Sequence, residues 1–222
     1  MKPDARALLL DAALAAIRRQ GYAATSVDAL CAAAGVTKGA FFHHFRSKEA
    51  LAIAAADHWS ATTGALFAAA PYHQHKDPLD RVLAYVDFRK ELVRGEIPEF
   101  TCLVGTMAQE AYAASDGIRD ACWRSIGGHA ATLEGDIGEA IEKYGVKGVD
   151  AKGLALFTQA TIQGAFILAK AKNDAGVAVQ CIEHLRRYLE LLFGRIEKKE
   201  KSHENASRRR RSAEGGEARR RA

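Results

Sequence analysis

The fold is decided by residues 24–51, which read ATSVDALCAAAGVTKGAFFHHFRSKEAL. Thr25 and Asp28 have the spacing of a capping box, in which two side chains satisfy free backbone N–H groups, so a helix is predicted to begin there. Gly35 suits the left-handed turn that ends one helix and lets another start almost at once. Two helices joined by so tight a turn predict a compact helical unit.

Further helices are predicted on both sides of this turn. Thr37 and Ser47 are good N-cap residues, so a short helix is expected after the first and a much longer one after the second. Upstream, the spacing of apolar residues predicts a helix from Asp4 to Gln20, which Gly21 ends. The positions expected to form a small core with that helix are Val27, Leu30, Ala34, Val36, Phe41 and Phe45.

The short helix after Thr37 is expected to turn one face away from this core. In a DNA-reading helix the N-terminal residues face base edges, while flanking donors hold phosphates. The residues expected on the outward face are Lys38, Gly39, Phe42 and His43. The residues expected as flanking phosphate donors are Thr25, Thr37, His44 and Lys48. A three-helix unit with a glycine turn can also be a plain helical corner, and the charge of this part of the chain favours DNA binding.

Charge is unevenly distributed along the chain, whose formal net charge is +5. Residues 1–49 carry seven Lys/Arg against four Asp/Glu, residues 50–200 carry 17 against 20, and residues 201–222 carry eight against three. A basic head, a mildly acidic body and a basic tail indicate that a polyanion is met at the ends of the chain. The apolar content of 48%, rich in Ala and Leu, favours a helical core.

The remaining composition predicts a cytoplasmic protein without a cofactor or metal. The longest uncharged stretch, Gly153 to Ala169, is shorter than the roughly 20 apolar residues of a membrane span, and the N-terminus lacks the pattern of a signal peptide. His73, His75 and Asp77 could be read as a metal site, but a polar linker is the simpler interpretation. The cysteines form no CxxC pair, which argues against zinc or a disulfide framework; they are Cys31, Cys102, Cys122 and Cys181.

The block at residues 24–51 closely resembles the DNA-binding segment of the tetracycline-repressor (TetR) family of bacterial transcriptional regulators, and the likeness spans about the first 60 residues. It is carried by the core spacing, the Gly35 turn and the ending His-Phe-x-Ser-Lys-Glu-x-Leu at residues 44–51. The resemblance implies backbone contacts from Thr25, Thr37, His44 and Lys48. It also implies that Lys38, Gly39, Phe42 and His43 lie in the major groove. Phe42 stands where the family usually has Tyr.

The resemblance further implies a homodimer that binds a palindromic operator, most often as a repressor, and that a small-molecule effector releases. The expected fold is all-α. A helix-turn-helix domain is predicted at residues 1–64 and a ligand-sensing bundle with a four-helix dimer interface at 65–200. The tail at 201–222 is expected to be disordered; it either adds phosphate contacts or only aids solubility.

Two sets of residues in the C-terminal half are candidates for function. A 4, 3, 4, 3 spacing near the end of the chain is typical of an interhelical seam, and we assign it to the dimer interface. The seam residues are Ala178, Ile182, Leu185, Leu189 and Leu192. The candidates for an apolar effector pocket are Phe88, Phe100, Cys102, Met107, Trp123, His129, Phe157, Gln159, Gln163 and Phe166.

Alternatives remain open at this stage. Cys102 is either an ordinary buried thiol or, as in some relatives, a sensor of electrophiles; no Lys, Arg or His adjoins it in the sequence to lower the pKa of its thiol. An enzyme is disfavoured because no Cys/His or Ser/His/Asp constellation emerges. An architectural DNA binder without a sensor is disfavoured by the large apolar C-terminal half.

Overall fold

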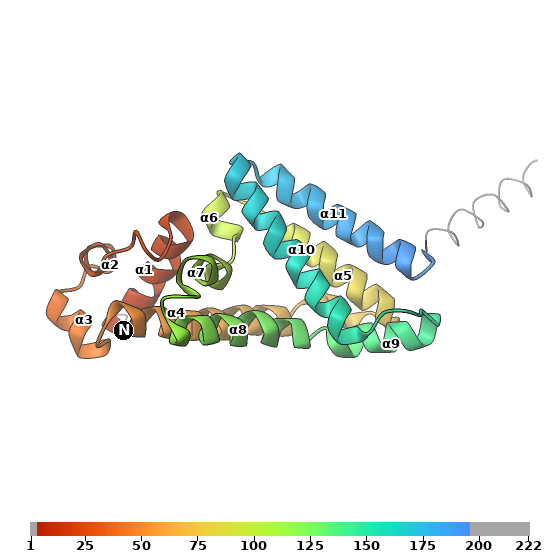
Figure 1. Ribbon diagram of the computed structural model, residues 1–222, viewed down its shortest axis with the longest axis horizontal. Coiled ribbons are helices and arrows are strands. Elements are labelled where there is room, and N and C mark those ends of the chain that lie inside the picture. The colour runs from red at the N-terminus through yellow and green to blue at the C-terminus, as the bar shows by residue number, and fades with distance from the viewer. Residues whose placement is uncertain (1–3, 196–222) are drawn as a thin grey trace, which may run out of the picture.

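The computed structural model describes residues 4–195, and every regular element in this range is helical (Figure 1). The predicted tail at residues 201–222 lies outside the described residues. The N-terminal helices are α1 (Ala5–Gln20), α2 (Val27–Ala34), α3 (Lys38–His44) and α4 (Lys48–Ala68). The remaining elements are the 3-10 turn η1 (Pro71–Gln74), α5 (Pro78–Glu91), α6 (Ile97–Phe100), α7 (Leu103–Ala111), α8 (Asp116–Ala131), α9 (Glu134–Tyr144), α10 (Ala151–Lys172) and α11 (Ala175–Leu192).

The helix ends follow local chemistry, with one difference from the prediction. Gly35 has the left-handed conformation expected of it, with φ of 64°. The cap of α2, however, is Ser26, whose Oγ accepts a hydrogen bond from the Ala29 amide at 3.1 Å. Thr25 is turned inward and donates its hydroxyl to the Gly21 carbonyl at 2.7 Å. The predicted capping box of Thr25 and Asp28 is therefore wrong by one residue.

The DNA-binding unit shares its hydrophobic core with the C-terminal half. Leu9, Leu30 and Phe41 from the first three helices are buried in the same cluster as Met107 of α7 and Ile118 of α8. The helix α4 runs alongside α8 at the bottom of the view in Figure 1. Through Phe67 it also joins a second hydrophobic core, which is formed mainly by α5, α9, α10 and α11. The domain boundary predicted at residue 64 thus falls inside a continuous helix.

The second core corrects the predicted dimer seam. Ala178, Ile182, Leu185 and Leu189 are buried within their own chain, where α11 packs against α10 and α5, and Leu192 packs partly against the same cluster. A spacing of 4 and 3 marks the face of a helix that meets another helix, but it does not say whether that helix belongs to the same chain. Ala178, Ile182, Leu185 and Leu189 are therefore not available to a dimer interface, whereas Leu192 stays a candidate for it.

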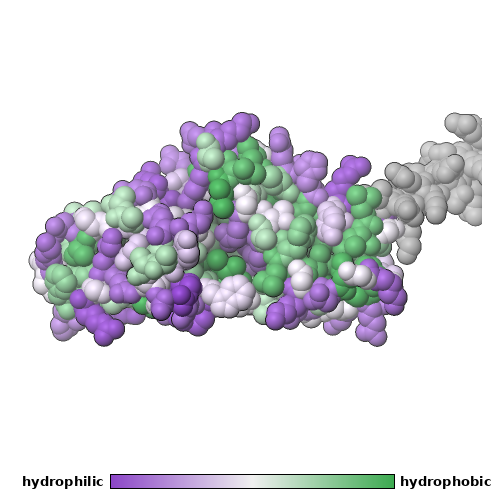
Figure 2. All heavy atoms as spheres, viewed as in Figure 1, coloured by the Kyte–Doolittle hydropathy of each residue, from purple (hydrophilic) through white to green (hydrophobic). Residues whose placement is uncertain are grey.

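The opposite side of the last two helices is apolar as well. α10 is long and apolar enough to cross a membrane by length and composition. One face of it, including Ile162 and Ala169, is buried in the second core. The other side exposes Phe157, Ile167 and Leu168. Figure 2 shows hydrophobic residues (green) gathered over the part of the molecule where α10 lies.

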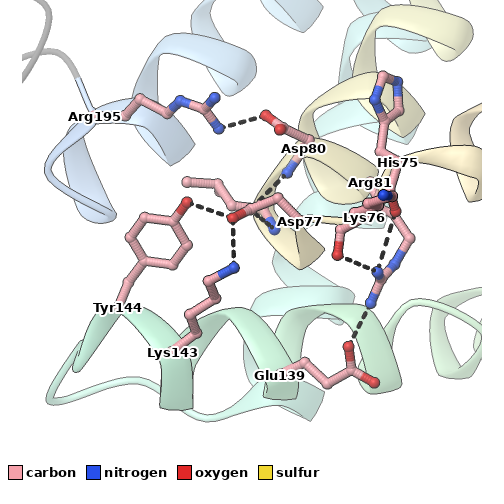
Figure 3. Close-up of polar contacts among 10 residues, drawn as sticks. His75, Lys76, Asp77, Asp80, Arg81, Glu139, Lys143, Tyr144 and Arg195 are labelled. Carbon is pink, nitrogen blue, oxygen red and sulfur yellow. Dashed lines mark hydrogen bonds and ion pairs between the residues drawn. The ribbon is translucent and has the colours of Figure 1, made fainter.

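The start of α5 is fixed by a polar cluster around Asp77 (Figure 3). Its carboxylate accepts hydrogen bonds from the Leu79 amide and the Tyr144 hydroxyl, both at 2.9 Å, and pairs with Lys143 Nζ at 2.8 Å. Burial alone would raise the pKa of Asp77, but these bonds outweigh it and lower the pKa to about 2. Nearby, Arg81 holds Glu139, and Asp80 pairs with Arg195. Asp77 therefore ties α5 to α9, and this role accounts for it without a metal.

This cluster predicts a pH-dependent contribution to stability. The folded pKa of Asp77 lies below the ordinary aspartate value of 3.8, so the contribution is complete above about pH 4 and is lost as pH falls toward 2. We expect Asp77→Asn to lower the free energy of unfolding by about 2 kcal/mol at pH 7 and by much less at pH 2. Urea unfolding at both pH values measures this. Asp150→Asn is the matched control, because Asp150 also caps a helix; an equal loss in both variants at pH 7 would contradict the prediction.

Candidate DNA-binding surface and effector cavity

The short helix α3 lies at the far end of the molecule from α11 and presents one face to solvent (Figure 1). Phe41 is fully buried, whereas the next residue, Phe42, is 54% exposed. Lys38, Gly39 and His43 are exposed too. The structure thus places all four predicted groove residues on the outside of the chain, where a DNA groove could reach them.

Lys38 is already engaged in the free protein. Its Nζ lies 2.7 Å from Oδ1 of Asp28 on α2, and both side chains are well exposed. The hydrogen bond that Lys38 donates to the Asp28 carboxylate raises the pKa of Lys38, so the side chain stays charged. An exposed ion pair is easily exchanged for another anion. Lys38 can therefore reach a base or a phosphate only by leaving Asp28.

Gly39 is not required by the fold. A Cβ added there would have only Thr37 Oγ1 within 4 Å, at 3.7 Å, which is ordinary van der Waals contact. Glycine inside a helix costs roughly 1 kcal/mol relative to alanine. Its presence in α3 therefore brings no internal packing gain, but it leaves the backbone open to a close approach from outside.

The predicted phosphate donors fall into two groups. Thr37 caps α3, and the Lys48 ammonium donates to the Tyr22 carbonyl at 3.1 Å while lying 4.3 Å from the Tyr22 ring centre. His44 Nε2 lies 3.9 Å from Oδ1 of Asp4. These three remain predicted DNA contacts. Thr25 is not a DNA contact, because it is only 1% exposed and its hydroxyl already donates a hydrogen bond to the Gly21 carbonyl.

A cavity of about 360 Å³ lies between α4, α5, α8 and α10. Six of the ten predicted pocket residues line it: Phe100, Cys102, His129, Gln159, Gln163 and Phe166. The other four do not line it. Phe88 and Met107 pack into the two cores, whereas Trp123 and Phe157 are exposed. Aromatic character alone does not say toward which side of a helix a ring points.

Sequence reasoning missed Arg89, the cation that lines this cavity. Its guanidinium carbon lies 5.3 Å from the ring centre of Phe67 and 5.7 Å from that of Phe166, and both rings are part of the wall. A signal was present in the sequence. Tyr85 and Val86 lie one turn before Arg89 on α5, and Leu92 and Val93 follow at the same spacing just after the helix ends; none of the four is charged at neutral pH.

Tyr85 organises the polar part of the wall from behind. Its hydroxyl accepts a hydrogen bond from Gln159 Nε2 at 2.7 Å and lies 3.0 Å from His129 Nε2. Burial, reinforced by the charge of Arg89, lowers the pKa of His129 to about 4. His129 is therefore neutral at physiological pH, and its Nε2 can accept a hydrogen bond from the Tyr85 hydroxyl.

Cys102 occupies a position that the sequence did not reveal. It lines the cavity, and its Sγ accepts a hydrogen bond from the Gly105 amide at 3.4 Å as the cap of α7. It also lies close enough to Arg18 and Lys170 to affect the pKa of each. The cationic neighbours that are missing along the sequence are supplied by α1 and α10.

Two contacts tie the cavity wall to the DNA-binding unit. Arg18 of α1 donates from Nη1 to the Glu99 carbonyl at 3.0 Å, and its guanidinium lies 5.1 Å from the Trp59 ring centre. Trp59 and Glu99 both line the cavity. At the far end of α7, Glu110 Oε2 accepts a hydrogen bond from the Ala23 amide at 2.8 Å, just before α2.

Three solved structures of bacterial proteins share this architecture. A TetR-family regulator from Agrobacterium tumefaciens gives a TM-score of 0.74 at 22% identity, covering 85% of this chain and 97% of that one. The regulatory protein TetR from Rhodobacter sphaeroides gives 0.74 at 25% identity, covering 83% and 98%. The reduced form of NemR from E. coli gives 0.68 at 24% identity, covering 83% and 96%.

Curated relatives match shorter segments. The transcriptional regulator AcuR of Cereibacter sphaeroides is 30% identical over 113 residues, which is 51% of this chain and 52% of that protein. YerO of Bacillus subtilis, an uncharacterised HTH-type regulator, is 42% identical over 41 residues, which is 18% of this chain and 14% of that protein. The match thus spans about half of AcuR and much less of YerO.

Family comparisons cover both halves of the chain. Residues 9–55 match the bacterial regulatory proteins of the tetR family, and residues 78–184 match the C-terminal domain of LmrA/YxaF-like transcriptional regulators. The first match contains α2 and α3 with the exposed face described above. The chain therefore belongs to the TetR family of DNA-binding transcriptional regulators, which are not enzymes.

Proposed function

We propose that this protein is a cytoplasmic homodimeric repressor that a small molecule releases from a palindromic operator. The observation that carries the proposal is the physical link between the cavity and the helix-turn-helix. The helix α7 is capped by Cys102 in the cavity wall, and its last turn carries Glu110, which holds the backbone that leads into α2. A displacement of one end of so short a helix must move the other.

Release would follow from a shift in population. The two recognition helices of a dimer must match half-sites about one DNA turn apart. An effector that binds more tightly to the state with a different spacing draws the dimer away from the operator. A coupling of about 1.4 kcal/mol already changes operator affinity tenfold.

For the dimer interface we propose the outward face of α10 and α11. Its exposed large apolar residues are Phe157, Ile167, Leu168, Tyr188 and Leu191. Contiguous apolar surface of this kind marks an interaction site on a protein surface. In a two-fold dimer the same face serves both subunits, which gives the four-helix arrangement expected for the family.

DNA binding is tested at Gly39. Gly39→Leu should weaken binding to a fragment of the protein's own promoter by at least about tenfold, because the side chain obstructs the groove contact. Thermal stability should not fall, because leucine is the better helix former. Fluorescence anisotropy and thermal melting measure the two effects. Gly135→Leu in α9 is the control, since a Cβ there meets nothing within 4 Å; equal weakening in both variants would remove α3 from the DNA surface.

The dimer face is tested by comparing two leucines. Leu168 is 52% exposed and Leu185 is 2% exposed. We expect Leu168→Glu to stay folded, sediment as a monomer and lose operator binding. Leu185→Glu should instead lower the melting temperature, because it buries a charge inside the subunit. Sedimentation and circular dichroism separate the outcomes, and a folded Leu168→Glu dimer would rule out the proposed face.

Effector release is tested on the protein–promoter complex with a metabolite library. A compound that fills the cavity should raise the melting temperature of the free protein, because it binds only the folded state. The same compound should lower operator affinity by about tenfold or more. A compound that binds the cavity tightly yet leaves operator affinity unchanged would argue against release by effector.

A further inference from the structure

Arg89 is a cation in a largely apolar cavity, and the fold gives it no counter-ion. Other charged residues on α5 do have ion-pair partners: Asp87 pairs with Arg186 at 2.9 Å, and Lys90 pairs with Glu183 at 3.4 Å. Within residues 4–195, no carboxylate lies within ion-pair distance of Arg89. The rings of Phe67 and Phe166 hold the guanidinium by cation–π contact, which does not neutralise its charge.

Glu99 also lines the cavity but does not supply the missing charge. Its carboxylate accepts a hydrogen bond from the Glu96 amide at 2.7 Å and so closes the capping box of α6. Its backbone carbonyl is taken by Arg18. The one carboxylate in the described wall is thus turned onto the start of its own helix.

The polar groups behind Arg89 are arranged as donors. The Tyr85 hydroxyl accepts a hydrogen bond from Gln159 and lies 3.0 Å from His129 Nε2, so its own proton is available for that nitrogen. A neutral histidine that accepts at Nε2 keeps its proton on Nδ1. Among the residues described as lining the cavity, Arg89 is then the only cation at neutral pH, beside a neutral donor on His129.

We propose that the effector is a small monocarboxylic acid bound as its anion, with the carboxylate on Arg89 and an apolar body against Phe67, Phe100 and Phe166. This inference rests on the proposed function, because it names the chemistry of the effector. The planar fork of arginine matches a carboxylate with two parallel hydrogen bonds. A phosphate ester would bring a second negative charge into a wall that offers a single cation. The apolar rings favour a hydrocarbon or aryl body.

The test uses matched acids and amides as probes. Straight-chain monocarboxylates from propionate to decanoate, together with phenylacetate and 3-phenylpropionate, are compared with their primary amides by calorimetry on the full-length dimer. We expect the best acid to bind at least about tenfold tighter than its amide. Arg89→Gln should abolish this preference, whereas Arg89→Lys should keep part of it because the charge remains. Arg94→Gln, which removes an exposed arginine just after α5, should change nothing.

A second measurement does not depend on the folding of a variant. Phenylglyoxal modifies accessible arginines, and mass spectrometry locates the modified residues. The best-binding acid should protect Arg89 in the wild-type protein and leave Arg94 unprotected. Its amide should protect neither.

The outcomes separate this inference from the proposed function. An amide that binds as well as its acid, a preference that survives Arg89→Gln, or no binding by any acid at millimolar concentration would each overturn the carboxylate assignment. Release of the operator by an uncharged compound would overturn it too, while the proposed function would stand. Acids that bind at Arg89 without releasing the operator would contradict the effector mechanism itself.

Discussion

The helix-turn-helix of this protein does not have a hydrophobic core of its own. Leu9, Leu30 and Phe41 are buried in one cluster with Met107 of α7 and Ile118 of α8, and with the α4 residues this cluster draws on six helices from both halves. Because a packed core resists deformation, α3 cannot be reoriented without moving α7 or α8. The position of α3 therefore depends on helices from both halves of the chain, and under the proposed function this dependence would let a cavity in the C-terminal half influence DNA binding.

Much of the N-terminal half could be predicted from the sequence because local chemistry determines it. Gly35 requires a left-handed turn, and Thr37 and Ser47 cap the helices that follow. The cap of α2 was predicted one residue too early, at Thr25 in place of Ser26, and this changes the expected set of DNA contacts. Ser26 and Thr25 are both good cap residues, and tertiary burial of Thr25 against Gly21 decides between them. A hydroxyl expected on DNA is instead part of the interior.

The C-terminal half was less predictable because its important contacts are between distant segments. The spacing of Ile182, Leu185 and Leu189 reveals a buried face, but only the path of the chain shows that α10 and α5 cover it. The same limit applies to Cys102, whose cationic neighbours Arg18 and Lys170 are 84 and 68 residues away in the sequence. Periodicity identifies which residues are buried; it does not identify their partners.

Trp59 provides a second path, besides α7, by which a molecule bound in the cavity could affect the DNA-binding helices. Its ring lines the cavity and also carries the guanidinium of Arg18. Burial lowers the pKa of Arg18, which means that its charge is held at some cost and depends on the Glu99 carbonyl and the Trp59 ring. A ligand that shifts Trp59 removes part of that support at the C-terminal end of α1. Since α1 packs on α2, α3 and α4, a shift of α1 would affect each of the helices that form the helix-turn-helix unit.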